Sequence, residues 1–197
     1  MTLPLGVLQH GDVRFTPALR GKRKALQQLA CGAVVKLLLR FDAPFWEEVL
    51  PQEKAVRGFL HAPGACFPTL WPVESAKAPL LVAWAGGPQA HRLLAMRRAS
   101  LPHAASESLR AYFGSRSSRA ALEAWYYHDW QSDRLARGAY SYVRVGGRDA
   151  RAHLARPLDD TLFFAGEAAD TEGESGTVTG ALQSGVRAAR EVIASLR

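Results

Sequence analysis

Residues Thr161 to Leu196 read TLFFAGEAADTEGESGTVTGALQSGVRAAREVIASL, and this segment decides the fold. Its first apolar run, Leu162-Phe163-Phe164, ends at Ala165-Gly166, which is typical of a short strand buried on both faces. The segment then predicts a glycine-containing loop and a long amphipathic helix, with a ligand where the two meet. The helix is indicated by apolar residues at steps of three and four: Val178, Leu182, Val186, Ala189, Ile193 and Leu196.

The start of this helix suits an anionic, flat ligand. Thr177 or Ser175 can cap it, and Gly176 and Gly180 leave its first turn without bulky side chains. A helix N-terminus carries a partial positive charge and free N–H groups. An ordinary strand, loop and helix at the end of an α/β domain would show the same periodicity, so the individual residues must decide between the two interpretations.

Those residues resemble a known family. FFAGE followed by SGTVTGALQSGVRAAREV resembles the C-terminal flavin-binding segment of the flavin-containing amine oxidases, which include monoamine and polyamine oxidases and lysine-specific histone demethylases. The resemblance implies that Gly166 and Glu167 approach the ribityl and pyrophosphate part of FAD. It also implies that Gly176, Thr177 and Val178 face the pyrimidine end of the flavin, where a helix N-terminus stabilises negative charge.

A second segment, CGAVVKLLLRFDAPFW, carries a lysine within an apolar strand. Alternation from Ala33 to Phe41 places Lys36 between Val34 and Leu38, on a face that is apolar around it. A charge there is costly unless it is paired or solvated, although a lysine on a half-exposed strand would look the same. The family resemblance implies that Lys36 is bonded through a water to flavin N5 and positions water or oxygen during reoxidation.

A third segment, WQSDRLARGAYSYV, resembles the part of the family that flanks the substrate. It implies that Trp130 packs near the flavin and that Tyr140 forms one wall of an aromatic slot for an amine. Core packing is the alternative for both residues. Monoamine oxidases attach FAD through a cysteine where this chain has Ala139, so the flavin is expected to be non-covalent. Thr177 replaces their second aromatic wall, which favours the polyamine oxidase and demethylase branch.

Composition indicates a folded protein with scattered basic charge. The 197 residues carry a formal net charge of +7, mostly from arginine, with no basic stripe that would favour a nucleic-acid partner. Cys31 and Cys66 are far apart and show no metal-ligand spacing, which suits a reducing cytoplasm. No signal peptide and no membrane-spanning apolar run is found. We expect a soluble cytoplasmic protein with no metal and no membrane partner.

The remaining patterns predict short elements. Leu3, Leu5 and Val7, with the run at residues 13–15, suggest two strands around a turn at residues 10–12, and a short helix follows from Lys22 to Leu29. Further strands are expected at residues 58–60, 66–71, 79–85 and 122–130, and helices at residues 90–98 and 106–113, separated by Pro102. Residues 114–118 are expected to form a loop.

The resemblance then gives the fold class, α/β (α+β). It implies a piece of an FAD domain (residues 1–16), a mixed-sheet substrate domain with flanking helices (residues 17–150) and the returning strand and helix of a two-dinucleotide-binding-type FAD domain (residues 151–197). The N-terminal Rossmann half is absent, because no two glycines stand two apart and G-x-G-x-x-G cannot be formed.

Three interpretations stay open. The chain is the C-terminal part of a split or truncated amine oxidase, which acts on a small-molecule amine with a complementary chain or as a homo-oligomer. The implied reaction moves hydride from the amine to FAD, and dioxygen then gives hydrogen peroxide. Alternatively, it is a non-catalytic remnant or interaction module that does not retain flavin alone. A carotenoid desaturase or protoporphyrinogen oxidase is the third interpretation, against which Lys36 and the RGAYSY segment argue.

Overall fold

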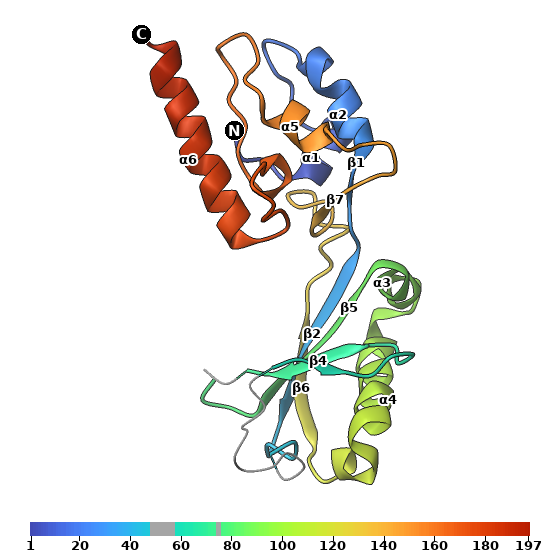
Figure 1. The fold of residues 1–197 in the computed structure, drawn as a ribbon. Helices are drawn as coiled ribbons and strands as arrows, with labels where there is room; N and C mark the ends of the chain where they lie inside the picture. Colours follow the sequence, from blue (N-terminus) through green and yellow to red (C-terminus); the bar gives the residue numbers. More distant parts are fainter. Residues whose placement is uncertain (48–57, 74–75) are drawn as a thin grey trace. The chain divides into compact units, whose positions relative to one another are not determined.

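The computed structural model describes residues 1–47, 58–73 and 76–197, drawn in Figure 1. The chain divides into two compact units, which we describe one at a time. Unit 1 comprises Met1–Gly32 and Trp130–Arg197, and unit 2 comprises Ala33–Asp129. Residues 17–32 and 130–150, assigned by the sequence to a substrate domain, therefore lie in the same unit as the C-terminal segment.

Unit 2 is built on a five-stranded sheet with the order β3-β4-β5-β2-β6. The strands are β2 (Val34–Phe41), β3 (Leu60–His61), β4 (Thr69–Pro72), β5 (Leu80–Gly86) and β6 (Leu122–Tyr127). Alternation in the sequence predicts β2 correctly. The prediction of a mixed sheet is wrong for the described strands, because each of their pairs is antiparallel. Antiparallel strands can be joined by short connections, as β4 and β5 are here.

The core of unit 2 lies between this sheet and two helices, α3 (Gly87–Leu94) and α4 (Leu101–Phe113), which Figure 1 shows on one face of the sheet. The inward residues of β2 are almost fully buried against helix residues such as Leu93 and Leu109. These inward residues are Val35, Leu37, Leu39 and Phe41. At one end, Phe45 makes edge-to-face contacts with Phe41, Trp46 and Phe113, at centroid distances of 5.2–5.3 Å.

Several predicted boundaries in unit 2 are wrong. Pro102 does not separate two helices but lies in the first turn of α4, where its missing N–H costs no helix hydrogen bond. The 3₁₀ helix η2 (Arg98–Ser100) precedes α4, and η3 (Gly114–Ser118) replaces the expected loop. Strand β6 ends at Tyr127, three residues before Trp130.

Unit 1 surrounds a smaller core that includes Leu5, Leu29, Leu154 and Phe164. Its elements are α1 (Leu5–His10), the 3₁₀ helix η1 (Leu19–Lys22), α2 (Arg23–Gln28), β1 (Leu29–Cys31), β7 (Ser141–Val143), α5 (Ala150–Ala155), the 3₁₀ helix η4 (Glu167–Ala169) and α6 (Val178–Ser195). β1 and β7 form a two-stranded antiparallel sheet. Helix α6 is confirmed, but its large apolar residues are exposed.

The predicted N-terminal strands are wrong, because residues 5–10 form α1. Pro4 stands just before the helix, and Gly11 closes it with a left-handed φ of 77°. These are helix start and stop signals, and they outweigh an alternation of only three apolar residues. Gly6 packs so closely that a Cβ there would lie 2.4 Å from the carbonyl oxygen of Arg137.

The predicted strand at residues 162–164 is also absent, although Phe164 is buried. An isolated bridge joins Leu158 and Leu162, and Phe163 and Ala165 exchange backbone hydrogen bonds with Met1. The next backbone groups are bonded by side chains of α6 instead of a neighbouring strand. The apolar run is therefore buried as predicted, but its backbone partners are different.

Lys22 is the buried cation of unit 1, with 4% of its surface exposed. Its Nζ donates to the carbonyl oxygens of His153, at 2.8 Å, and Arg156, at the end of α5, and lies 4.5 Å from the centre of the Phe164 ring. Free carbonyls at a helix C-terminus favour a cation. Burial nevertheless lowers the pKa of Lys22 to about 8, and the nearby Arg156 charge acts in the same direction.

Two glycines of α6 allow a matched test of its packing. A Cβ at Gly180 would lie 2.2 Å from the carbonyl oxygen of Glu174, whereas no described atom lies within 4 Å of the same position at Gly185. We expect Gly180→Ala to lower the free energy of unfolding by about 1–3 kcal/mol, because backbone must shift. Gly185→Ala should leave it unchanged or raise it by up to about 1 kcal/mol. Urea unfolding measures the free energy of unfolding of both variants. An equal change in the two would contradict the close packing at Gly180.

Lys22 predicts a pH dependence of stability. The unfolded chain keeps the lysine proton up to its ordinary pKa of 10.5, whereas the folded chain releases it near pH 8. Between these values the unfolded state binds more protons, so the free energy of unfolding should rise with pH, by up to about 3 kcal/mol. Lys22→Met should remove this rise, and Lys24→Met, at an exposed position, should keep it. Urea titrations at several pH values measure this dependence. The same pH dependence of the free energy of unfolding in both variants would contradict the role of Lys22.

Candidate functional site

Three segments of unit 1 meet at the carboxylate of Glu167. Its Oε1 accepts from the backbone N–H of Ser141 at 3.1 Å, and its Oε2 accepts from the Ser141 hydroxyl at 2.7 Å and the Gly176 N–H at 2.9 Å. The start of β7, the start of η4 and the turn before α6 are thereby joined. We call Tyr140, Ser141, Gly166, Glu167 and Gly176 the Glu167 junction.

Arg151 of α5 also binds to residues of the junction. Its Nη1 donates to the Ser141 hydroxyl at 2.7 Å and to the carbonyl oxygens of Glu167 and Ala168 at 3.2 and 3.3 Å. Its Nη2 donates to the Ser141 carbonyl at 3.0 Å, and Nη1 lies 3.9 Å from Oε2 of Glu167. The sequence does not indicate Arg151, because nothing in the local pattern around a single arginine predicts contacts with residues 10 to 17 positions away.

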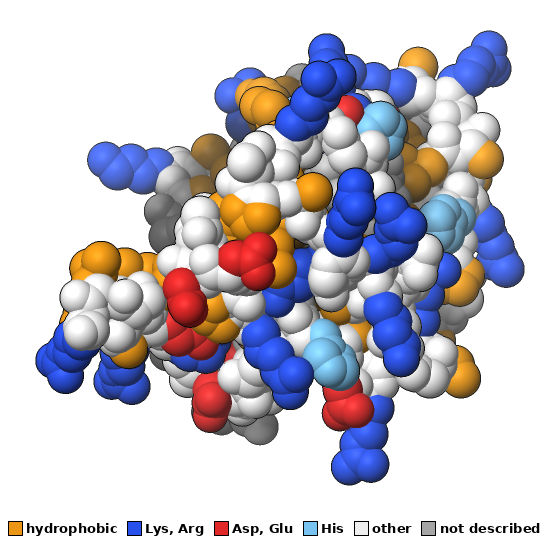
Figure 2. Space-filling model, turned by 90° about the horizontal axis from the view of Figure 1, so that it is seen from above, with side chains coloured by type: hydrophobic (Ala, Val, Ile, Leu, Met, Phe, Trp, Pro, Cys, Tyr) orange, Lys and Arg blue, Asp and Glu red, His pale blue; other side chains and the backbone are white. Residues whose placement is uncertain are grey.

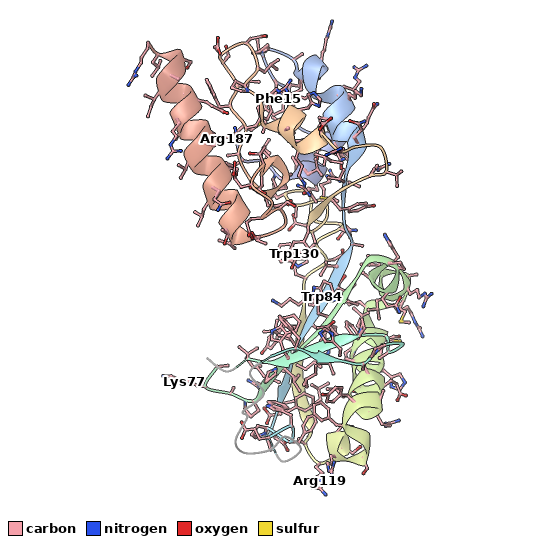
Figure 3. The ribbon with its side chains drawn as sticks, in the orientation of Figure 1. Phe15, Lys77, Trp84, Arg119, Trp130 and Arg187 are labelled. Carbon is pink, nitrogen blue, oxygen red and sulfur yellow. The ribbon has the colours of Figure 1, made fainter. Side chains whose placement is uncertain are left out.

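Helix α6 fixes the backbone beside the junction. The Ser184 hydroxyl accepts from the Gly166 N–H and donates to the Gly166 carbonyl, at 2.9 and 3.0 Å. Arg187 donates to the carbonyl oxygens of Phe164, Ala155 and Ala169 and pairs with Glu191 at 2.8 Å. Figure 3 labels Arg187 on α6. Ser184 and Arg187 were also missed, because the apolar spacing draws attention to the opposite side of this helix.

The glycines at the junction leave room for a ligand. Gly166 has a φ of +117°, and no described atom lies within 4 Å of a Cβ built there. Gly176 has a φ of +77°, and its Cβ position would lie 3.8 Å from the Cβ of Tyr140. Tyr140, Glu167 and Gly176 are thus neighbours, and the family resemblance assigns all three to one site. Both glycines adopt conformations that other residues rarely take.

The N-terminus of α6 is open beside Gly176. Thr177, and not Ser175, is the cap: its Oγ1 accepts from the Gly180 N–H at 3.0 Å and donates to the Glu174 carbonyl at 2.6 Å. Val178, the first residue of the helix, is 77% exposed. The positive end of the helix dipole is therefore accessible to an anionic group.

The segment that carries Tyr140 is held on its other side by an ion pair. Arg137, with a φ of +58°, donates from Nε and Nη2 to Asp12 at 2.9 and 2.8 Å. These bonds, with a contribution from His10, hold the pKa of Asp12 below its usual range. Cys31 packs against Gly138 and donates weakly to the Ala139 carbonyl, and burial raises the pKa of its thiol.

Both predicted aromatic residues of unit 1 are about half exposed: 43% for Trp130 and 52% for Tyr140. Their backbones are fixed, because the Trp130 carbonyl accepts from Gly138 and the Tyr140 carbonyl accepts from Gly32. Burial in a core therefore accounts for only part of either ring. A cavity of about 220 Å³ is lined by Gly166, Glu167 and Ala139, together with other residues of the segments 1–5 and 164–169.

Lys36 lies in unit 2 and is not part of the Glu167 junction. It stands on β2 opposite Trp84 of β5, labelled in Figure 3, and its Nζ is 5.8 Å from the centre of the Trp71 ring. The side chain is exposed, although Val34 on the same face is buried and Leu38 is half-buried. The cost of a buried charge, expected from the alternation, is therefore not incurred.

The residues of the junction fit a flavin. Two glycines leave the backbone accessible to a flat ligand, and the exposed helix N-terminus can stabilise a negative charge on it. The Glu167 carboxylate accepts three hydrogen bonds within the protein. The described residues contain no group of three or more His, Cys, Asp or Glu side chains that could hold a metal ion. Among the described helices, none is long and apolar enough to cross a membrane.

A glycine-containing loop that leads into an exposed helix N-terminus is a place where an anionic group can bind. A family model described as flavin containing amine oxidoreductase matches residues 1–193. The chain therefore belongs to this family, and the family implies a flavin cofactor.

Named relatives agree with this assignment. Lysine-specific histone demethylase 1 homolog 3 of Arabidopsis thaliana is 34% identical over 201 residues, covering 100% of this chain and 12% of the relative. Histone demethylase-like protein A of Aspergillus fumigatus is 33% identical over 209 residues, covering 99% and 19%. A putrescine oxidase variant matches with a TM-score of 0.81 at 21% identity, covering 98% of this chain and 42% of that one. The chain thus spans less than half the length of each.

The Glu167 junction predicts a specific loss of stability. In Glu167→Gln, the amide nitrogen must face either the Ser141 N–H or the Gly176 N–H, so that two donors oppose each other. We expect the free energy of unfolding to fall by about 1–3 kcal/mol in urea titrations. Glu174→Gln, at an exposed position in the same loop, is the control and should change it by less than about 0.5 kcal/mol. Equal effects would show that the junction contributes little.

Proposed function

We propose that this chain is the flavin-contacting and substrate-contacting part of an FAD-dependent amine oxidase. The observation that carries the proposal is the Glu167 junction, where Tyr140, Gly166 and Gly176 are neighbours beside the open N-terminus of α6. A bound flavin would supply the redox chemistry: it would take hydride from the carbon next to the amine nitrogen, leaving an imine, and would pass the two electrons to dioxygen, giving hydrogen peroxide. The protein supplies binding, orientation and electrostatics.

Each residue has a defined task in this proposal. The backbones of Gly166 and Gly176 let the cofactor approach closely, and the first turn of α6 stabilises negative charge at its pyrimidine end. The half-exposed side chains of Tyr140 and Trp130 are proposed to contact the carbon skeleton of an amine. Ala139 has no nucleophilic side chain, so the flavin is held without a covalent bond at this position.

Lys36 is proposed to act on oxygen rather than on the amine. Its side chain is exposed on β2, and its ammonium group forms no ion pair with a carboxylate of the described residues. A positive charge held beside the reacting oxygen favours the negative charge that develops during reoxidation. This role requires the flavin to lie within reach of Lys36.

The substrate class is an alkyl amine. The relatives carry the names putrescine oxidase, cyclohexylamine oxidase and lysine-specific histone demethylase, which share an amine nitrogen on an alkyl carbon. Because this chain contains no G-x-G-x-x-G turn, the pyrophosphate is bound by a further polypeptide surface.

The proposal is tested on the tagged chain isolated from its own cells with the polypeptides bound to it. We expect a visible flavin spectrum that is bleached without air by at least one of putrescine, cyclohexylamine and a methyl-lysine peptide, and that returns in air. Denaturation should release the flavin from the protein, because the attachment is not covalent. A preparation without flavin, or a flavin that none of these amines reduces, would contradict the proposal.

Lys36 can be tested separately in the same preparation. Lys36→Met should leave flavin content and bleaching by amine unchanged but slow the return of the spectrum in air at least tenfold, equivalent to about 1.4 kcal/mol. Lys77→Met, at an exposed lysine of the same unit labelled in Figure 3, should reoxidise at the normal rate. Stopped-flow mixing with oxygen measures both rates, and identical kinetics for the two variants would remove the role.

A further inference from the structure

Helix α6 has two opposed faces, and only one of them is used within unit 1. The inward face carries small or polar residues, Gly180, Ser184 and Ala188, which are buried, together with Arg187. At about 100° per residue, the large apolar residues fall on the opposite side of the helix. They are 53–81% exposed: Val178, Leu182, Val186, Ile193 and Leu196. Figure 1 shows the other segments of unit 1 on one side of α6.

The exposed face is a continuous apolar surface. No charged residue interrupts it from Val178 to Leu196, and Ala189 and Gly185 fill the gaps between the larger side chains. We call these residues, with the five large ones, the α6 stripe. Its width is that of a helix that faces a protein core. Because burying one such side chain contributes about 1.5–3 kcal/mol, leaving five in water is unfavourable, and a covering surface is expected.

The position of the α6 stripe indicates what covers it. The stripe begins at Val178, directly after the Thr177 cap and two residues after Gly176 of the Glu167 junction. A polypeptide that covers the stripe therefore also borders the site proposed for the flavin. That site needs a turn for the pyrophosphate, which this chain does not contain.

The length of the relatives supports the same occupant. This chain covers 42% and 43% of the solved putrescine and cyclohexylamine oxidases, with TM-scores of 0.81 and 0.80. More than half of each of those chains lies outside the matched part. A second copy of this chain is a poorer occupant, because two molecules that each carry a net charge of +7 repel one another.

We propose that the α6 stripe is the docking surface for the polypeptide that carries the dinucleotide-binding turn. The inference rests on the proposed function and names the partner of the same site. The partner presents an apolar face to the stripe and acidic side chains along its edge, where Arg190 and Arg197 are exposed. Blue Lys and Arg side chains are spread over the face drawn in Figure 2, and the formal net charge of +7 also favours an acidic partner.

Capture of the partner tests the proposal. The tagged full chain is isolated from its own cells, and bound polypeptides are identified from their peptides by mass spectrometry. The double variant Leu182→Glu with Val186→Glu places two charges on the stripe. The control, Gln183→Glu with Ser195→Glu, adds the same charge to exposed polar positions of the same helix, outside its first turn and outside the stripe. A differently tagged second copy reports self-association.

We expect the wild-type chain and the control to capture a polypeptide that contains G-x-G-x-x-G, and the stripe variant to capture at least tenfold less of it. Equal capture by both variants, absence of any such polypeptide, or capture of the second copy in its place would overturn the proposal. Circular dichroism checks folding; if the stripe variant unfolds, Leu182→Ser with Val186→Thr replaces it.

The two proposals fail in different ways. A captured complex that lacks flavin, or whose flavin no amine reduces, would refute the proposed function and leave the docking surface intact. A flavin-containing preparation whose partner is held equally well by the stripe variant would refute the docking surface alone.

Discussion

The hydrogen bonds of Glu167 are the constraint on which the rest of unit 1 depends. A single carboxylate accepts from Ser141 and Gly176, and Arg151 closes the group by bonding to Ser141 and to the backbone of η4. A partly buried charged group is stable only when its hydrogen-bonding capacity is met. Here the Glu167 carboxylate and the Arg151 guanidinium each form several hydrogen bonds. Because these bonds join residues 141, 151, 167 and 176, they determine where Tyr140 and the start of α6 lie.

Helix α6 acts on the same region through its inward face. The side chains of Ser184 and Arg187 form hydrogen bonds with backbone groups of residues 164, 166 and 169, in place of a neighbouring strand. The helix is therefore both the element that offers its N-terminus to a ligand and the element that positions the glycine of the preceding loop. This arrangement leaves its large apolar residues on the outside, where they are available to a partner rather than to the core of unit 1.

Local patterns were sufficient for some of these features and not for others. The period-two pattern of β2, the spacing in α6 and a cap at Thr177 or Ser175 were predictable, because each depends on residues close together in the sequence; only the structure chooses Thr177. The residues of the site from Tyr140 to Val178 came from a family resemblance, and the structure brings Tyr140, Glu167 and Gly176 together. Arg151, Ser184 and the missing strand at 162–164 depend on tertiary hydrogen bonds, which leave no periodic signal. Nor does spacing alone say whether an apolar stripe faces its own core or a partner, as α6 demonstrates.

The central claim is that a flavin binds against the Glu167 junction. Hydrogen–deuterium exchange of the isolated complex, compared before and after removal of its flavin, tests this most directly. The account predicts slower exchange in the flavin-loaded protein at residues 140–141, 166–167 and 176–179, with no change in β3 and β4 of unit 2. Unchanged exchange at these positions, with protection elsewhere in the chain, would contradict it.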